Sequence, residues 1–343
     1  MTINATQSAN IANAIENWFS TAARDLPWRN EDTPWGRLLS ELMAQQTQID
    51  RVAEKWTEMI IRFPTPLSMA KSEEQDVLLL WQGLGYYRRA RYLKEASEQI
   101  CREYGGEVPQ TVEELLTLRG VGKYTAGAVA SIAYNARKPI VDGNVHRVVC
   151  RLQNQGDYSV NDKWTWKMAS QLVDHCDTPS KLNEGLMELG ATVCTPKNPK
   201  CEECPVHSMC GAFQNGTQLE VPKPKAAPQK QKEFHYAVLF KKENKIALEH
   251  RAGKGLWAGM WQVPTIESSK KLTKKEIGSH FDVKQHLEKL GTFKHTLTHK
   301  MIEFHVYECS ESKKQLDWYD TATLHEFPFA NAQKKVLSFK SLS

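Results

Sequence analysis

Two glycines near the middle of the chain form a pattern that could bind phosphate. Gly120 and Gly122 lie one residue apart and are followed by Lys123 and a run of small and apolar residues, 124–133, that predicts a packed helix. Glycine lets a backbone approach a partner closely, and the free N–H groups at a helix N-terminus bind anions. We therefore expect Gly120, Gly122 and Lys123 to contact phosphate. The alternative is an ordinary connection between two helices, because a Gly-x-Gly pattern alone has low specificity.

Asp142 is a candidate catalytic carboxylate in the next part of the chain. It follows the short apolar stretch Pro139-Ile140-Val141 and precedes a helical pattern over residues 145–152. An aspartate in this position is a common N-cap. A capping aspartate beside a bound phosphodiester could also face the sugar that is being processed, so the two interpretations do not exclude each other.

Glu41 is a second candidate carboxylate. It lies beside the apolar stripe of a pattern from Leu38 to Ile60 that predicts one long helix. One turn further on, Gln45-Gln46-Thr47-Gln48 is a block of uncharged hydrogen-bonding side chains, which is unusual in a helix interior and could reach the edges of bases. On its own, Glu41 is more simply explained as a carboxylate at the rim of a surface helix.

Four cysteines form the most specific pattern in the chain: Cys194, Cys201, Cys204 and Cys210 are separated by six, two and five residues. A four-cysteine zinc site usually pairs two short Cys-x2-Cys arms across a longer gap. A single compact loop with the present spacing instead suits a cube-shaped [4Fe–4S] cluster. Zinc is the alternative.

The elements that must position these residues divide into two classes along the chain. Helical patterns occupy residues 10–23, 38–60, 76–104 (interrupted at residues 82–87) and 163–191, and no strand pattern of any length appears before residue 210. Residues 214–232 have the Pro, Lys and Gln bias of an extended linker. We therefore predict an all-α domain over residues 1–213.

The periodicity changes after the linker. Alternating patterns predict strands at 234–240, 246–249, 292–298 and 301–307, and helical patterns cover 274–280 and 330–339. We expect residues 233–343 to form an α+β domain that is mostly sheet.

Composition is consistent with a folded chain of two domains. The 343 residues are 41% hydrophobic, and the net charge of +5 is uneven: residues 1–210 hold 23 Lys and Arg against 26 Asp and Glu. A DNA-binding first domain would therefore depend on local patches and helix N-termini. The N-terminal residues lack a cationic leader and no run is long enough to span a bilayer, so we expect a cytoplasmic protein with no membrane partner.

The chain resembles the helix-hairpin-helix DNA glycosylases of the endonuclease III superfamily, and most closely their MutY branch of adenine glycosylases. Glu41, the Gly-Val-Gly turn, Asp142 and the four cysteines carry the resemblance, which runs nearly end to end. It also includes these stretches: Leu26-Pro27-Trp28-Arg29, Ser40 to Gln48, Gly83-Leu84-Gly85-Tyr86-Tyr87, Val141 to Val145, and Leu256 to Trp261. It implies a multidomain protein: an N-terminal all-α helix-hairpin-helix glycosylase with an iron–sulfur cluster loop, and a C-terminal α+β MutT/Nudix-like domain.

The resemblance assigns the two carboxylates different roles. Glu41 would be the general acid that protonates the departing adenine, and Asp142 would stabilise the positively charged sugar, supported by Tyr124 and Asn144. Adenine leaves readily only when a ring nitrogen is protonated, and its departure produces an oxocarbenium-like sugar. We expect burial to raise the pKa of Glu41, whereas Asp142 should remain ionised.

The resemblance also implies a pocket for an adenine that has left the base stack. Trp28, Arg29 and Glu184 would line this pocket. Gln46 or Tyr86 would fill the gap in the duplex, and Thr47 would contact the substrate from the same polar block as Gln46. The expected partner is double-stranded DNA with adenine opposite 8-oxoguanine or guanine, bound by a monomer.

One position separates reaction types within the superfamily. In the bifunctional endonuclease III relatives, a lysine that forms a Schiff base follows the Gly-Val-Gly turn by two residues. Tyr124 occupies that place here, and Lys123 precedes it by one residue, a rotation of roughly 100° on a helix. We therefore expect base removal without efficient strand cleavage.

The C-terminal domain is expected to recognise a lesion and not to hydrolyse nucleotides. Residues 265–278 lack the Arg-Glu pair and paired glutamates with which Nudix hydrolases hold a metal and a triphosphate. The resemblance implies recognition of 8-oxoguanine through a loop that in relatives commonly has the sequence Phe-Ser-His. This chain has Leu297-Thr298-His299, in which Thr298 retains a hydroxyl and His299 the imidazole, whereas Leu297 replaces the aromatic ring.

Two other functions compete with adenine excision. The same scaffold could support a glycosylase for thymine or oxidised pyrimidines, although the C-terminal domain argues against it. Helix-hairpin-helix modules can also bind duplexes without catalysis. Glu41 and Asp142 together distinguish the enzyme from a binding protein, because binding alone requires neither carboxylate.

Overall fold

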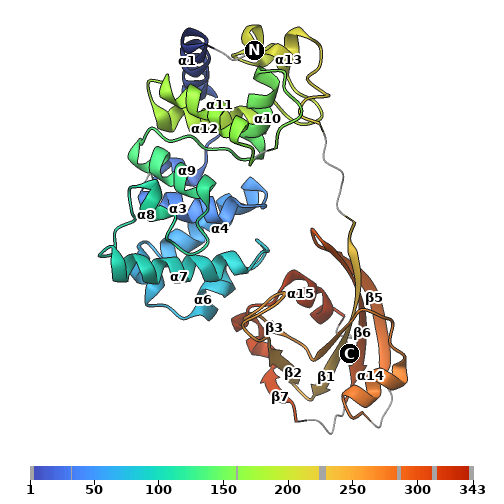
Figure 1. Ribbon diagram of the computed structural model, residues 1–343. Coiled ribbons are helices and arrows are strands. Elements are labelled where there is room, and N and C mark those ends of the chain that lie inside the picture. The colour runs from blue at the N-terminus through green and yellow to red at the C-terminus, as the bar shows by residue number, and fades with distance from the viewer. Residues whose placement is uncertain are drawn as a thin grey trace. The chain divides into compact units, whose positions relative to one another are not determined.

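The computed structural model describes residues 4–31, 33–159, 161–223, 229–283, 287–310 and 315–339 (Figure 1). Every regular element described before residue 223 is a helix, as the sequence predicts. The helices, two of which (η1 and η2) are single 3-10 turns, are α1 (Ala5–Ala22), α2 (Pro27–Asn30), α3 (Pro34–Ala44), α4 (Ile49–Arg62), α5 (Pro66–Ala70), α6 (Glu74–Leu80), α7 (Arg88–Glu103), α8 (Val112–Leu115), α9 (Lys123–Tyr134), α10 (Gly143–Leu152), α11 (Lys163–Asp174), α12 (Pro179–Thr192), η1 (Cys201–Glu203), η2 (His207–Met209) and α13 (Gly211–Gln214).

Contacts divide the chain into two compact units. The first unit comprises Met1–Lys71 and Tyr92–Lys225, and the second comprises Ser72–Arg91 and Ala226–Ser343. The boundary at residue 225 falls in the expected linker, 214–232, of which residues 224–228 lie outside the described part of the chain. Residues 72–91, placed in the first domain from the sequence, group with the second unit through long-range contacts such as that of the Gln82 amide with the Phe327 carbonyl oxygen, at 3.3 Å.

The core of the first unit contains the apolar stripe of α1. Ile11, Ile15 and Phe19 are buried at helical spacing, as the sequence predicts. They pack against α12, where a Cβ atom at Gly185 would lie 2.7 Å from the Ile15 side chain. A glycine is therefore required at position 185 for the close approach of these helices.

The predicted helix from Leu38 to Ile60 is wrong, because the structure contains two helices with a loop between them. α3 ends at Ala44 and α4 begins at Ile49. Gln46 has a φ of 56°, in the left-handed region, so the helix cannot continue through it. The Gln45 amide donates to the Thr125 hydroxyl at 3.2 Å, which holds the loop against α9.

The predicted helix over residues 163–191 is also interrupted. α11 ends at Asp174 and α12 begins at Pro179. The Glu16 carboxylate accepts hydrogen bonds from the backbone N–H groups of Asp177 and Thr178 in the break, at 3.1 and 2.9 Å. A carboxylate from α1 thus satisfies donors that a continuous helix would have paired internally.

The second unit is built on a seven-stranded mixed sheet with the order β3-β2-β1-β6-β5, in which β4 also pairs with β1 and β7 with β2. β1 and β6 are parallel, and the other pairs are antiparallel. The elements are β1 (Gln231–Lys242), β2 (Lys245–His250), β3 (Trp261–Gln262), β4 (Thr265–Ser268), α14 (Lys274–His280), β5 (Glu288–Thr296), β6 (Lys300–Cys309), β7 (Asp317–Asp320), η3 (Thr321–Glu326) and α15 (Asn331–Leu337).

One face of this sheet forms a core with α14. Alternate side chains of β1, including Tyr236 and Phe240, pack with Ile277 and Phe281. The predicted strand at 292–298 is too long, because β5 ends at Thr296 and the Leu297 N–H donates to the Lys300 carbonyl oxygen at 2.8 Å. Thr298 and His299 therefore lie in the turn between β5 and β6.

None of the helices in the described ranges combines the length and the apolar character needed to cross a membrane.

Candidate active site

A cleft of about 930 Å³ in the first unit brings together most of the residues predicted from the sequence. The predicted residues that line it are Trp28, Arg29, Glu41, Gln46, Thr47, Gly120, Gly122, Lys123, Tyr124, Asp142, Asn144 and Glu184. Besides the four cysteines, three predicted residues are not among those that line the cleft: Tyr86, Thr298 and His299. They belong to the second unit.

Glu41 is a buried carboxylate on the side of α3 that faces the cleft. Its residue is only 7% exposed. Burial raises the pKa of Glu41 to about 7, although the charge of Arg37 and a hydrogen bond from Tyr124 act in the opposite direction. The predicted direction of the shift is confirmed, and a carboxyl group with this pKa can hold a proton near neutral pH and release it to a base.

Asp142 is the N-cap of α10, as one of the two sequence interpretations states. Its carboxylate accepts the N–H of Val145 at 2.7 Å and the side-chain amide of Asn144 at 3.1 Å. Burial raises the pKa of Asp142, and these two donors with the charge of Arg147 oppose that rise. Its ionised state therefore stays a prediction, while its N-cap role is confirmed.

Arg147 joins the Asp142 region to the cysteine loop. Its guanidinium donates to the Asn144 side-chain oxygen at 2.8 Å and to the backbone carbonyl oxygens of Gly190 and Cys194, both at 2.7 Å. Gly190 is also close-packed, since a Cβ atom there would lie 2.6 Å from the Asn144 Cβ. The position of Asn144 is thus fixed by both packing and hydrogen bonds.

Tyr124 lies in the first turn of α9 and connects Glu41 to the opposite wall of the cleft. Its hydroxyl is 3.0 Å from the Met187 sulfur and also forms a hydrogen bond with Glu41. Burial and the neighbouring carboxylates raise the pKa of Tyr124 well above its usual value. Tyr124 therefore remains protonated and donates a hydrogen bond.

A network of ion pairs forms another wall of the cleft. Arg29 pairs with Glu184 and with Glu188, both at 3.1 Å, and the buried Arg37 pairs with Glu184 at 3.2 Å. Burial raises the pKa of Glu188, but its contacts with Arg24 and Arg29 outweigh that effect and lower the pKa overall. Several donors and acceptors are thereby held in fixed positions around a pocket.

Sequence analysis missed Arg37 and Glu188 as members of this site. Arg37 lies one helical turn before Glu41, and Glu188 lies one turn after Glu184, so both share a helix face with a predicted residue. The four-residue spacing from Glu41 and from Glu184 is the feature of the sequence that could have identified Arg37 and Glu188.

The glycine pair has the local geometry of a turn that opens a helix. Gly120 has a φ of +81°, and a Cβ atom there would lie 2.7 Å from Tyr92, so a side chain is excluded on two grounds. Gly122 is the N-cap of α9. Lys123 also lines the cleft, and its ammonium lies 3.7 Å from the centre of the Trp166 ring, a cation–π contact.

Tyr86 and Thr298 contact each other in the second unit. Their hydroxyl oxygens are 2.5 Å apart, although 212 residues separate them in the sequence. Tyr86 is 47% exposed. The His299 carbonyl oxygen accepts the N–H of Gln231 at the start of β1.

The four cysteines of the loop have the properties of ligands for one cluster. None forms a disulfide, all are partly buried, and the charges of the others raise the pKa of Cys201, Cys204 and Cys210 in addition to the larger effect of burial. Arg151 donates to the Cys194 sulfur at 3.3 Å. Sulfur ligands of a single zinc ion would lie about 3.8 Å apart. Among the described residues, the four cysteine sulfurs do not all lie within 4.8 Å of one another. Their wider spacing fits the ligands of a cluster better than those of a single zinc ion.

Three known families match successive parts of the chain. Residues 39–182 match a family described as the HhH-GPD superfamily of base excision DNA repair proteins. Residues 194–210 match the iron–sulfur binding domain of endonuclease III, which decides between zinc and an iron–sulfur cluster in favour of the [4Fe–4S] cluster. Residues 235–339 match the NUDIX domain.

Curated relatives with the name adenine DNA glycosylase align over most of the chain. The protein from Buchnera aphidicola subsp. Baizongia pistaciae is 32% identical, with 83% of this chain and 82% of that protein covered. The Homo sapiens protein is 33% identical, with 86% of this chain and 66% of the human protein covered. The chain spans only 40% and 41% of the lengths of the Rattus norvegicus and Mus musculus proteins.

Solved structures support the fold of the first part of the chain. A thermostable thymine-DNA glycosylase is 29% identical with a TM-score of 0.57, and the alignment covers 62% of this chain and 100% of that one. Endonuclease III in a trapped covalent intermediate with DNA has a TM-score of 0.54 at 23% identity, with 63% of this chain and 99% of that one covered. The all-α fold expected for the first part of the chain is confirmed.

Proposed function

Because the chain belongs to the adenine DNA glycosylase family, we propose that it hydrolyses the N-glycosidic bond of adenine mispaired with 8-oxoguanine, or with guanine, in base excision repair. The observation that carries this proposal is the pair of carboxylates in unlike surroundings at one cleft. Glu41 is buried with a pKa raised to about 7, whereas Asp142 accepts two hydrogen bonds at the N-terminus of α10. An acid and an electrostatic partner are what this bond cleavage needs.

The proposed mechanism assigns one task to each group. Glu41 protonates a ring nitrogen of adenine, and the glycosidic electron pair leaves with the base. The sugar then carries positive charge, which the Asp142 carboxylate stabilises from the end of α10. Glu41, now ionised, accepts a proton from the water that attacks the sugar, so the acid is regenerated. Tyr124 orients Glu41, and Asn144 orients Asp142.

Other residues of the cleft would bind the DNA and not react with it. The ion pairs of Arg29 with Glu184 and Glu188 hold donors and acceptors that suit the edge of an extrahelical adenine. Gly120, Gly122 and Lys123 supply the backbone N–H groups and the charge that suit a phosphate. The four cysteines hold the [4Fe–4S] cluster, whose role in this proposal is to fix the loop of residues 194–210.

The test is single-turnover excision on three duplexes, with adenine opposite 8-oxoguanine, guanine or thymine, each analysed with and without alkali. Excision at the first two that needs alkali for strand breakage supports the proposal. Glu41→Gln should abolish excision and leave duplex binding nearly unchanged. Glu58→Gln, which changes an exposed glutamate of α4, is the matched control and should retain full excision.

Two results would contradict the proposal. Excision by Glu41→Gln at the wild-type rate would remove Glu41 from the acid role. Absence of adenine release with retained duplex binding would favour a pyrimidine-specific enzyme or a binding protein.

A further inference from the structure

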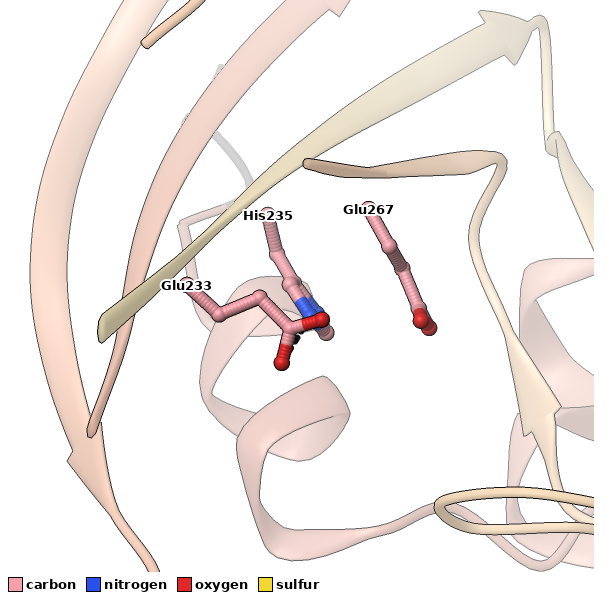
Figure 2. Close-up of side chains that lie close together, drawn as sticks. All are labelled: Glu233, His235 and Glu267. Atoms are coloured by element: carbon pink, nitrogen blue, oxygen red, sulfur yellow. Dashed lines mark ion pairs between the residues drawn. The ribbon is translucent and has the colours of Figure 1, made fainter. Parts of the chain in front are cut away.

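Three side chains of the second unit form a cluster that adenine excision does not use. Glu233 and His235 are two residues apart in β1, and His235 lies directly opposite Glu267 of β4. Because side chains alternate across a strand, all three lie on the same face of the sheet. One ligand atom from each lies within 4.8 Å of the other two. Figure 2 shows the three side chains extending in the same direction from the two strands.

His235 is a buried group whose ring nitrogens have no hydrogen-bond partner among the described residues. Its side chain is 1% exposed, and neither ring nitrogen forms a hydrogen bond there. Leaving a buried polar group unpaired is destabilising. The ring packs against Phe304, with centroids 5.0 Å apart, and its Nε2 lies 4.0 Å from the nearer Glu233 oxygen, which is too far for a hydrogen bond. The space between the imidazole and the carboxylates suits an additional bound group.

The groups around the cluster favour the neutral form of the imidazole, which is the form that binds a metal ion. Burial lowers the pKa of His235, although Glu267 and Glu233 act in the opposite direction. Lys300 pairs with Glu233 at 2.9 Å and Arg251 with Glu267 at 2.7 Å. These contacts hold both carboxylates in place, as hydrogen-bonded neighbours of metal ligands commonly do.

We propose that Glu233, His235 and Glu267 bind a divalent transition-metal ion, with Zn²⁺ as the preferred ion. One imidazole nitrogen and two carboxylate oxygens are ligands that zinc accepts, whereas Mg²⁺ prefers oxygen ligands alone. Zinc bonds of about 2.0–2.2 Å place tetrahedral ligand atoms about 3.4 Å apart. The ligand atoms are 4.0 Å apart between His235 and Glu233 and all lie within 4.8 Å of one another, so the two glutamate side chains must move inward on binding. Water would occupy the fourth position.

The ion would reach the site from the side of the carboxylates. The Glu267 side chain is 36% exposed and that of Glu233 is 20% exposed, whereas the imidazole closes the inner end. A bound ion would link β1 to β4 and pair the His235 nitrogen. Neither the cluster cysteines nor the cleft residues of the first unit take part.

The test uses the full chain with its iron–sulfur cluster intact, treated with chelator and titrated with Zn²⁺ in a calorimeter. Elemental analysis should give one zinc per chain in addition to iron, with no change in the visible absorbance of the cluster. His235→Phe and Glu267→Gln should each weaken zinc binding by about tenfold or more. His305→Gln is the matched control and should leave zinc binding unchanged. His305 lies 3.1 Å from Glu303 on the same sheet, but that pair has only one carboxylate and is not part of the three-residue cluster.

Glu267→Gln keeps the test decisive if His235→Phe does not fold, because Glu267 is exposed. Equal zinc affinity in the wild type and Glu267→Gln would overturn the proposal, as would the absence of zinc binding by the wild type. Zinc uptake that is matched by loss of cluster absorbance would place the ion at the cysteines and would also overturn it. Mg²⁺ in large excess should not displace the zinc.

Discussion

The pKa of Glu41, raised to about 7 by burial, predicts how the reaction rate depends on pH. Only the protonated carboxyl can donate a proton to adenine, so the single-turnover excision rate should fall as pH rises through about 7. Above that point the decrease should approach tenfold per pH unit. The measurement is the rate between pH 5.5 and 9 on a duplex with adenine opposite 8-oxoguanine. A rate that is flat across this range would show that proton transfer from Glu41 does not limit excision.

The same residue predicts a pH-dependent cost in stability. The pKa of Glu41 is about 7 in the folded chain against an ordinary value of 4.5, so the folded state binds more protons between these values. The free energy of unfolding should therefore fall as pH rises from about 4.5 through about 7, by on the order of 3 kcal/mol. Glu41→Gln removes this pH-dependent change in the free energy of unfolding. Urea unfolding should find the variant more stable than the wild type at pH 8, with the difference shrinking toward pH 5.

The control for this comparison is Glu58→Gln, whose exposed side chain should give the same small difference at both pH values. A wild type that is more stable than Glu41→Gln at pH 8 would mean that the ionised Glu41 is stabilised by its neighbours, contrary to the effect of burial.

Tyr124 predicts the type of reaction. A Schiff base requires a primary amine, and the Tyr124 side chain is a phenol, which cannot form one in any protonation state. Borohydride should therefore trap no covalent complex between the wild type and DNA. Tyr124→Lys places an amine beside Glu41 and Asp142, and it should give a trapped complex together with strand cleavage. A trapped complex with the wild type would instead identify Lys123 as a reactive amine.

At the scale of elements, the loop between α3 and α4 predicts a conflict between stability and function at Gln46. A non-glycine residue with a φ of 56° costs on the order of 1 kcal/mol. Gln46→Gly should raise the free energy of unfolding by about that amount relative to Gln46→Ala, measured by urea unfolding. Both variants lack the side chain proposed to fill the duplex gap, so both should excise adenine more slowly. If both variants excised adenine at the wild-type rate, the Gln46 side chain would not contact the substrate. The conclusion that the backbone of Gln46 is strained would be unaffected.

Periodicity predicted which segments are helical but not where two of the helices end. The loop at Gln45–Gln48 contains neither glycine nor proline, and its position depends on contacts such as that of Gln45 with Thr125, which lies 80 residues further on. The break before Pro179 depends on Glu16 of α1 in the same way. The short strands β3, β4 and β7 have two to four residues each, too few for an alternating pattern, and they exist because longer strands pair with them.

The site was predictable where a residue type carried the chemistry by itself. Glu41, Asp142 and the four cysteines belong to motifs, and the structure brings the first two to one cleft although 100 residues separate them. Arg37 has no motif, because its role depends on its distance from Glu184. The grouping of residues 72–91 with the second unit likewise follows from contacts with residues about 160 to 245 positions away.

At the scale of the whole molecule, charge is divided unequally. Residues 211–343 hold 22 Lys and Arg against 14 Asp and Glu, whereas residues 1–210 have a small acidic excess. On the proposed function, the cleft would attract DNA through local groups such as the N-terminus of α9, and the basic part of the chain would supply most of the long-range attraction.

Thr298, in the turn between β5 and β6, is the residue on which the proposed discrimination depends. Thr298→Ala removes one hydroxyl, and the loss of a hydrogen bond worth about 1 kcal/mol should slow excision opposite 8-oxoguanine by roughly fivefold. The single-turnover rate opposite guanine should not change. Thr296→Ala is the matched control, because Thr296 is an exposed threonine at the end of β5. This variant should excise adenine at the wild-type rate on both duplexes. Tyr86→Phe distinguishes the effect of the Thr298 hydroxyl from that of the Tyr86 hydroxyl, because it removes the hydroxyl of Tyr86 and leaves Thr298 in place. Equal slowing on both duplexes by Thr298→Ala would mean that this turn binds DNA without distinguishing the lesion, and recognition of 8-oxoguanine would then have to come from other residues.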